Sequence, residues 1–190
     1  MFLNSGLKFY AIFFIAIQTI IMPATAVNMW SGKVVYVVDG DTIHVLSDDG
    51  QGKNHLRKIR IEGIDAPEIC QLYGAESRAA LKKYLLKQQV TISTISLDDY
   101  GRELAKITFN NDDVGSWMVR NGYAWSYHSK FSAGPYRVDE ALATRSRLGL
   151  FASGQPTEPR IFRREHGSCY APRPKFRPEF RPENDRKRDN

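Results

Sequence analysis

Acidic and basic side chains gather in three short segments of the chain, in types that suit hydrolysis of a phosphodiester bond beside a hard cation. The segments are residues 39–42, residues 60–68 and residues 99–102. Carboxylate oxygens are the ligands that Ca²⁺ and Mg²⁺ prefer, and guanidinium groups match the geometry of phosphate oxygens. No single segment is specific. Their ordered combination predicts metal-dependent chemistry on a phosphate.

Carboxylates from two separate segments are candidates to share one cation. Asp39 and Asp41 flank a glycine between two predicted strands, and Asp65 lies in the second segment. The chain has no cluster of His and Cys that would indicate zinc, so we expect Ca²⁺ or Mg²⁺, with water and a substrate phosphate completing its shell. Taken alone, residues 39–41 are better explained as a turn.

Two arginines and one glutamate supply the remaining chemistry. Arg60 lies on the polar face of a predicted strand that ends in the acidic loop, and Arg102 follows a turn glycine; both could bind a phosphate. Glu68 follows a proline and could orient or deprotonate a water beside a cation. Alternatively, Arg60 forms a salt bridge to Asp41 or Asp65. Glu68 and Arg102 could be ordinary surface charges.

Aromatic and histidine side chains are weaker candidates. Trp125 and Tyr127 follow Gly122 and could stack on a base or contact a phosphate. Aromatic residues at this density more often belong to a core, and we keep only Tyr127 as a substrate-binding residue. The four histidines are scattered along the chain, so we predict no catalytic or ligand role for them.

Sequence patterns predict the elements that position these residues. Strands are expected where β-branched residues recur or alternate with polar ones, at residues 33–38, 42–46, 55–61, 90–96 and 103–109. Helices are expected at residues 75–87, 112–122 and 135–149. In the last helix, we assign Val138, Ala141 and Leu142 to the buried face. This order describes an α+β domain, and a five-stranded OB-fold β-barrel with three helices is one compact arrangement of it.

The N-terminus has the features of a secretory signal peptide over residues 1–26. Lys8 is its only charge, residues 9–22 are apolar, and residues 24–26 are small, as at a cleavage site. The apolar stretch is short for a membrane-spanning helix, which needs about 20 residues. We therefore expect cleavage and a secreted or periplasmic protein without a membrane span, rather than one held by an N-terminal membrane anchor.

The C-terminus changes character after the predicted domain, which we place at residues 27–152. We expect residues 153–190 to form an extended or disordered basic tail, since residues 171–190 repeat Arg-Pro units with few apolar side chains. Cys70 and Cys169 are the only cysteines, and an oxidising compartment would permit a disulfide that ties the tail beside the acidic loop. Two inert thiols are the alternative, and a reactive thiol is not supported, because the cysteines do not form a C-x-x-C motif.

The formal net charge of the chain is +6 at pH 7, which favours polyanionic partners such as nucleic acid. Charge alone does not distinguish nucleic-acid-binding proteins from other basic exported proteins. Composition carries no signal for assembly, so we expect a monomer without a stable protein partner.

Taken together, the motifs resemble those of the staphylococcal nuclease (thermonuclease) family, which are calcium-dependent nucleases built on an OB-fold barrel. The resemblance covers residues 33–151. Besides Arg60 and the Tyr-Gly pair at 73–74, it rests on Asp-Gly-Asp-Thr at 39–42, Ile-Asp-Ala-Pro-Glu at 64–68, Tyr-Gly-Arg-Glu-Leu-Ala at 100–105, Val-Arg-Asn-Gly-Tyr-Ala at 119–124 and Leu-Gly-Leu-Phe at 148–151.

This resemblance implies a role for each matching acidic position. Asp41 and Asp65 would bind Ca²⁺ through their side chains, and Ala66 would bind it through its backbone carbonyl. Asp39 would be an acidic neighbour of the ion. Glu68 would orient or activate the attacking water.

The resemblance also implies an activity. Arg60 and Arg102 would bind the scissile phosphate and stabilise the charge that develops on it. The expected reaction is hydrolysis of DNA and RNA with little sequence preference, leaving 3′-phosphate ends. The alternative is a non-catalytic OB-fold module that binds nucleic acid and would not need the full set of arginines and carboxylates.

The chain departs from the staphylococcal enzyme at four places. Ala66 stands where that enzyme has a threonine, which is harmless if only the carbonyl binds the metal. The loop at residues 69–72 is shorter, so a lid or substrate contact from it is expected to be missing. Asp99 stands where that enzyme has a lysine, which argues against binding of a terminal phosphate. The Pro- and Arg-rich tail has no counterpart there.

Overall fold

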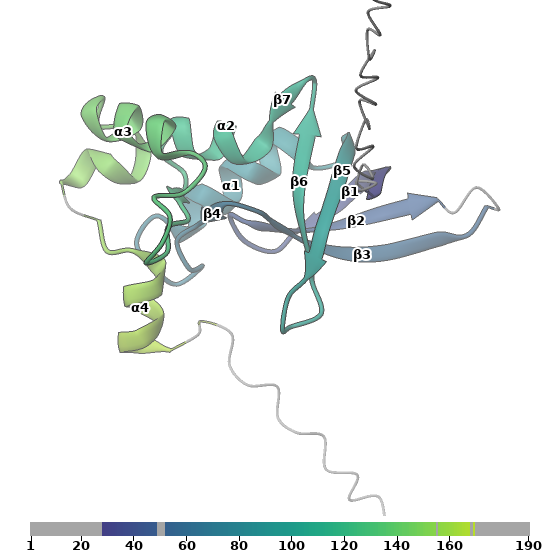
Figure 1. Ribbon diagram of the computed structural model, residues 1–190, viewed down its shortest axis with the longest axis horizontal. Coiled ribbons are helices and arrows are strands. Elements are labelled where there is room, and N and C mark those ends of the chain that lie inside the picture. Colours follow the sequence, from purple (N-terminus) through teal and green to yellow (C-terminus); the bar gives the residue numbers. More distant parts are fainter. Residues whose placement is uncertain (1–27, 49–51, 155, 168, 170–190) are drawn as a thin grey trace, which may run out of the picture.

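Five strands close into a β-barrel in the computed structural model, which describes residues 28–48, 52–154, 156–167 and 169 (Figure 1). The barrel strands are β1 (Asn28–Val37), β2 (Thr42–Asp48), β3 (Asn54–Ile61), β5 (Gln89–Leu97) and β6 (Glu103–Phe109). They run in the order β3-β2-β1-β5-β6 with antiparallel neighbours, and a parallel pairing of β3 with β6 closes the ring. The predicted α+β fold with a five-stranded barrel of the OB type is confirmed.

The barrel interior is filled by β-branched side chains, and their burial fixes the strand register. On β3, Ile59 and Ile61 are buried, so Arg60 between them points to the other face. A slip by one residue would exchange the two faces and bury the guanidinium, which makes the register strongly specified. The hydrophobic core therefore places Arg60 at the edge of the acidic loop.

Three α-helices lie where the sequence predicts them, namely α1 (Gly74–Leu85), α2 (Val114–Arg120) and α3 (Arg137–Arg145), followed by the 3₁₀ helix η1 (Gly149–Ser153). On α1, Leu81 and Leu85 are fully buried in the core. Asp113 in the short strand β7 (Asp112–Asp113) caps α2, since its carboxylate accepts a hydrogen bond of 3.0 Å from the Ser116 N–H. A side-chain cap of this kind satisfies a backbone donor that would otherwise lack a partner.

The buried face predicted for α3 is wrong. Val138, Ala141 and Leu142 are exposed, and Ala143 is the buried residue of this helix. The reason is that α3 docks through polar contacts: the Glu140 carboxylate accepts a hydrogen bond of 2.6 Å from the Ser126 N–H. Hydrophobic spacing alone could not reveal this orientation.

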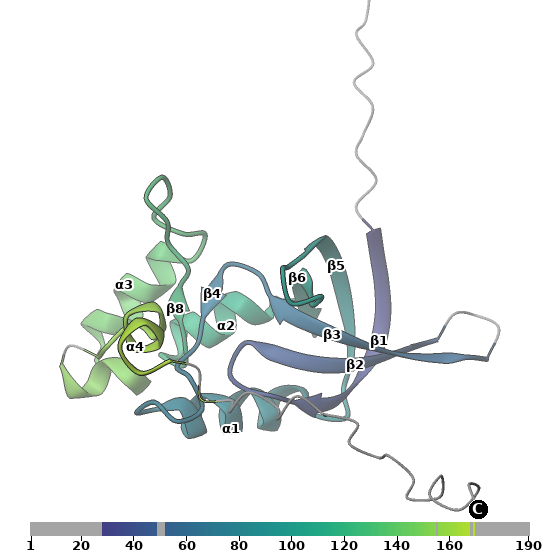
Figure 2. The same cartoon turned by 90° about the horizontal axis from the view of Figure 1, so that it is seen from below.

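A further helix, α4 (Pro159–His166), lies within the segment that we predicted to be an extended tail, so that prediction is wrong for these residues. Pro159 stands in its first turn, where the missing N–H has no helical partner in any case. Figure 2 shows α4 at one end of the barrel, close to the small sheet of β4 (Ile64–Asp65) and β8 (Trp125–Ser126).

A disulfide between Cys70 and Cys169 connects the chain three residues after α4 to the loop before α1, which confirms the predicted bridge. The predicted signal peptide and the Arg-Pro repeats at 171–190 lie outside the described residues. Within the described part of the chain, no helix is both long enough and apolar enough to cross a membrane.

Candidate active site

Asp41 and Asp65 are brought together by the turn between β1 and β2 and by the end of β4. Each is buried, with a relative exposure of 5%. Gly40 allows the turn to approach closely, because a Cβ at this position would lie 1.9 Å from the Ser77 Oγ and 2.7 Å from the Ala66 Cβ. The glycine is therefore required for packing between the first acidic segment and the second.

Arg60 bridges the two aspartates. Its Nη1 lies 2.7 Å from the Asp41 Oδ2, and its Nη2 lies 3.3 Å from the Asp65 Oδ1. Nη2 also donates to the backbone carbonyl of Ile64 at 3.3 Å. The salt bridges that we considered as an alternative for Arg60 are thus present, and they hold its guanidinium at the edge of the acidic cluster.

Ala66, whose carbonyl is the third predicted metal ligand, lies beside the same carboxylates. Its N–H donates a hydrogen bond of 3.2 Å to the Asp41 Oδ2. Among the described residues, no three His, Cys, Asp or Glu side chains form a group that could hold a metal ion. A cation bound by Asp41 and Asp65 would therefore need a backbone oxygen, water or substrate for the rest of its shell.

Burial and repulsion between neighbouring carboxylates oppose ionisation in this cluster. Burial raises the pKa of Asp39 to about 7, and the nearby charge of Asp41 adds to this effect. Burial also acts to raise the pKa of Asp41, but the Arg60 charge and hydrogen bonds from Thr42 and Ala66 hold it below its usual value.

Asp65 shows the same effect of burial. Burial raises its pKa, the negative charge of Asp41 adds to the shift, and hydrogen bonds from Arg163 oppose it. Buried carboxylates that repel one another are stabilised by a hard cation. The chemistry of these donors therefore fits a divalent metal ion.

Arg102 reaches the cluster through Thr42. Its Nη1 donates to the Thr42 Oγ1 at 3.4 Å, and that hydroxyl donates to the Asp41 Oδ1 at 2.8 Å. The other edge of its guanidinium is held by Asp98, whose Oδ2 accepts a hydrogen bond of 2.7 Å from Nε. Arg102 is thus an anchored side chain one residue away from the carboxylates, rather than a free surface charge.

Glu68 lies on the loop between β4 and α1, and its carboxylate faces an arginine that sequence analysis missed. The Arg163 Nη1 on α4 lies 2.8 Å from the Glu68 Oε1 and 3.2 Å from the Asp65 Oδ1. Its Nη2 lies 3.1 Å from the Asp65 Oδ2. The position of Cys169, only six residues further along the chain, was the one signal in the sequence that could have indicated this contact.

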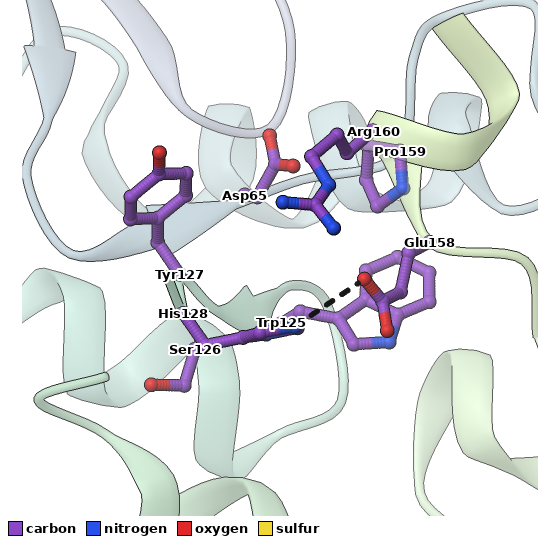
Figure 3. A pocket seen from close by; sticks show the side chains of 8 residues that line it. All are labelled: Asp65, Trp125, Ser126, Tyr127, His128, Glu158, Pro159 and Arg160. Carbon is purple, nitrogen blue, oxygen red and sulfur yellow. Dashed lines mark ion pairs between the residues drawn. The ribbon is translucent and has the colours of Figure 1, made fainter. Parts of the chain in front are cut away.

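Tyr127 lies at the rim of the cluster and is about half exposed. It lines a small pocket together with Asp65, and the pocket walls come from β4, β8, the residues that follow β8 and the start of α4 (Figure 3). An ion pair of 3.7 Å between His128 and Glu158 lies in the same wall. The structure thus brings Tyr127 near Asp65, while a contact with substrate remains a prediction.

Comparison with known proteins agrees with this geometry. The sequence pattern of the family described as staphylococcal nuclease homologue matches residues 58–153, about half of the chain. A probable staphylococcal-like nuclease from Oryza sativa subsp. japonica is 38% identical over 108 residues, which is 57% of this chain and 29% of the rice protein. The chain thus spans less than a third of the length of this plant relative.

Bacterial relatives match over more of their length. An uncharacterized endonuclease from Haemophilus influenzae is 32% identical over 134 residues, covering 70% of this chain and 72% of that protein. A micrococcal nuclease from Shigella flexneri is 29% identical over 163 residues, covering 78% of this chain and 91% of its own. With its barrel and its matching sequence pattern, this chain belongs to the staphylococcal nuclease family.

Proposed function

We propose that this protein is an exported, Ca²⁺-dependent nuclease that hydrolyses phosphodiester bonds of DNA and RNA with little sequence preference and leaves 3′-phosphate ends. The observation that carries this proposal is the position of Arg60 between Asp41 and Asp65. It joins a phosphate-binding group to two buried carboxylates of the kind that bind a hard cation. Membership of the family and the names of the relatives support the same reading.

The residues that would hold Ca²⁺ are Asp41 and Asp65, through their side chains, and Ala66, through its carbonyl. When bound, a divalent cation polarises phosphate oxygens and makes a nearby water a stronger nucleophile. Asp39 lies beside Asp41, and burial raises its pKa to about 7, so it adds a full negative charge only above that pH.

The other side chains act on the phosphate and on the attacking water. Arg60 and Arg102 bind the non-bridging oxygens of the scissile phosphate and stabilise the charge that develops on them. Each keeps N–H donors for this task, since a guanidinium has five and their contacts with Asp41, Asp65 and Asp98 use only part of them.

Glu68 accepts a proton from a water as the water oxygen bonds to phosphorus. The bond between phosphorus and the 5′ oxygen then breaks, and the departing oxygen takes up a proton from solvent. Base and phosphate binders must lie within hydrogen-bonding reach of one reacting centre. The contacts run from Arg102 through Thr42, Asp41, Arg60, Asp65 and Arg163 to Glu68, so these groups border one cluster.

The test is release of acid-soluble fragments from single-stranded DNA and from RNA, with added Ca²⁺ and with a chelator. Glu68→Gln is measured in parallel, because it keeps the size of the side chain but removes the base. We expect Ca²⁺-dependent cleavage that falls by orders of magnitude in the variant, and 3′-phosphate termini on the fragments. Folded protein that binds DNA without cutting it would instead identify a non-catalytic binding module.

Export is proposed on separate grounds. The Cys70–Cys169 disulfide needs an oxidising compartment to persist, and such bridges are rare in reducing cytosol. Cell fractionation combined with N-terminal sequencing of the mature protein tests this point. An intact N-terminus in the membrane fraction would identify an anchored protein, and a cytosolic protein with two free thiols would contradict export.

A further inference from the structure

The C-terminal segment, defined as residues 156–167 together with Cys169, is attached to the loop that carries Glu68 at three separate points. One is a hydrogen bond from a side chain to a backbone carbonyl, one is an ion pair and one is covalent. They are Gln71 Nε2 to the Thr157 carbonyl at 2.6 Å, Arg163 Nη1 to the Glu68 Oε1 at 2.8 Å, and the disulfide between Cys70 and Cys169. The segment thus contacts the loop through its beginning at Thr157, its middle at Arg163 and its end at Cys169.

The first attachment acts on the backbone of Glu68. The Gln71 side-chain Oε1 accepts a hydrogen bond of 3.1 Å from the Glu68 N–H, and the Gln71 N–H donates one of 2.8 Å to the Glu68 carbonyl. Gln71 is buried, and its amide nitrogen is held by Thr157. The C-terminal segment therefore orders the peptide groups around Glu68 through one buried amide.

The second attachment acts on the side chain of Glu68. The planar guanidinium of Arg163 contacts both carboxylate oxygens of Asp65 and one oxygen of Glu68, at distances of 2.8–3.2 Å. Two neighbouring carboxylates repel each other, and a shared guanidinium with a fixed fork of donors can hold both in one geometry. The Glu68 side chain is only 15% exposed and the Asp65 side chain 7%, so screening by water is limited on their side.

We propose that Arg163 is a positioning residue of this site: it holds the Glu68 carboxylate beside Asp65, and the Cys70–Cys169 disulfide keeps it there. This inference rests on the proposed nuclease function, in which Glu68 is the base. It extends the site beyond residue 153, where the match to the family pattern ends. Arg163 acts through Glu68 and is not assigned a contact with the reacting atoms.

Kinetics of Arg163→Ala test the positioning role. Loss of a group that orients a catalytic side chain typically costs about 10–100-fold in activity. At saturating Ca²⁺ we expect a fall of that size in kcat, with the KM for single-stranded DNA changed by less than about threefold, because Arg163 contacts Glu68 and Asp65 and neither of the proposed phosphate-binding arginines. Arg163→Lys should recover part of kcat, since an ammonium can pair with Glu68 but cannot bridge both carboxylates.

Arg164→Ala is the matched control. Arg164 follows Arg163 on α4, but its side chain is 75% exposed, against 36% for Arg163, and it pairs with the adjacent Glu165 at 4.0 Å. It should leave kcat unchanged. Equal losses in both variants would assign the effect to helix α4 or to its charge and overturn the proposal. A higher kcat in Arg163→Ala would also overturn it, because Arg163 would then be a brake.

A double-mutant cycle shows whether Arg163 acts through Glu68. If it does, Arg163→Ala should lower the residual activity of Glu68→Gln by less than about twofold, since effects of residues that act as a unit do not multiply. A further fall of the size seen in the wild-type background would mean that Arg163 acts independently of Glu68.

Hydrogen exchange provides a measurement that does not depend on activity. In Arg163→Ala and in the Cys70→Ser, Cys169→Ser double variant, amides of residues 66–74 should exchange faster, while β3 and β5 stay unchanged. Unchanged exchange in the loop would refute the anchoring. If the variants exchange faster but the wild type cuts no nucleic acid, the anchoring is confirmed, while the catalytic assignment and the proposed function are both wrong.

Discussion

Replacing Arg60 by alanine in the metal-free protein would leave the Asp41 and Asp65 carboxylates buried without their shared counter-ion. The Arg60 side chain is 18% exposed and each aspartate side chain is 7% exposed. Removing one partner of a buried ion pair costs about 3–5 kcal/mol. Because the guanidinium retains some contact with water, we expect a loss of about 2–4 kcal/mol in the free energy of unfolding at pH 7.5.

Calcium should stabilise Arg60→Ala more than it stabilises the wild type. A ligand that binds only the folded state at one hundred times its Kd stabilises by about 2.7 kcal/mol. In Arg60→Ala, Asp41 loses its guanidinium partner and Asp65 keeps only Arg163, so a divalent cation has more to gain there. The Ca²⁺-induced increase in unfolding free energy should therefore be larger in the variant.

Urea unfolding followed with and without Ca²⁺ measures both effects, and Arg57→Ala is the matched control. Arg57 lies on the same strand, pairs with Glu103 at 2.5 Å and stacks over Trp30, away from the acidic cluster. Arg57→Ala should be less stable than the wild type, and Ca²⁺ should raise its unfolding free energy only by as much as it does in the wild type. Equal Ca²⁺ effects in the wild type and the two variants would refute the reasoning, because the cation would then bind elsewhere or not at all.

Two further predictions concern pH and redox state. The pKa of Asp39 is raised to about 7 in the folded protein. Between about pH 4 and pH 7 the folded state therefore keeps a proton on Asp39 that the unfolded chain has lost. The stability of the metal-free protein should fall as pH rises through this window. Asp39→Asn should flatten that slope in urea unfolding at pH 5 and pH 8, and an unchanged slope would contradict the assignment. Reduction of the Cys70–Cys169 bridge, which spans 99 residues, should lower both stability and kcat, with a chain-entropy contribution of about 4–5 kcal/mol as an upper value. Equilibrium unfolding with and without reductant measures the stability, and release of DNA fragments measures kcat. Full activity of the reduced protein would show that the disulfide does not contribute to the site.

The barrel was predictable because its signals are local. Ile59 and Ile61 alternate with polar residues, and the same alternation that fills the core also assigns Arg60 to the opposite face. The proximity of Asp41 to Asp65 was not predictable in this way, because it depends on packing of Gly40 against Ala66 across the fold. Here the ordered motifs and the family resemblance supplied what periodicity could not.

The two misassigned regions depend on contacts that hydrophobic spacing does not record. On α3 the orientation is set by polar contacts: Glu140 is bonded to a backbone N–H, and apolar residues such as Leu142 stay exposed. Helix α4 is only eight residues long, too short to be stable through propensity alone. Its anchors, an ion pair and a disulfide, join residues about 100 positions apart, so a local pattern carries little trace of them.

Contacts with the candidate site continue beyond the end of the predicted domain. A boundary drawn from composition falls at residue 152, and the family pattern ends at residue 153, so both exclude Arg163. Yet Arg163 makes three contacts of 3.2 Å or less with two carboxylates of the candidate site. A segment that is not needed to close the barrel can still be needed to orient one side chain, because core packing and placement of the Glu68 carboxylate depend on different contacts. With Arg163 as the proposed positioning residue, the functional unit would extend to Cys169, where the covalent bond holds α4 against the Glu68 loop.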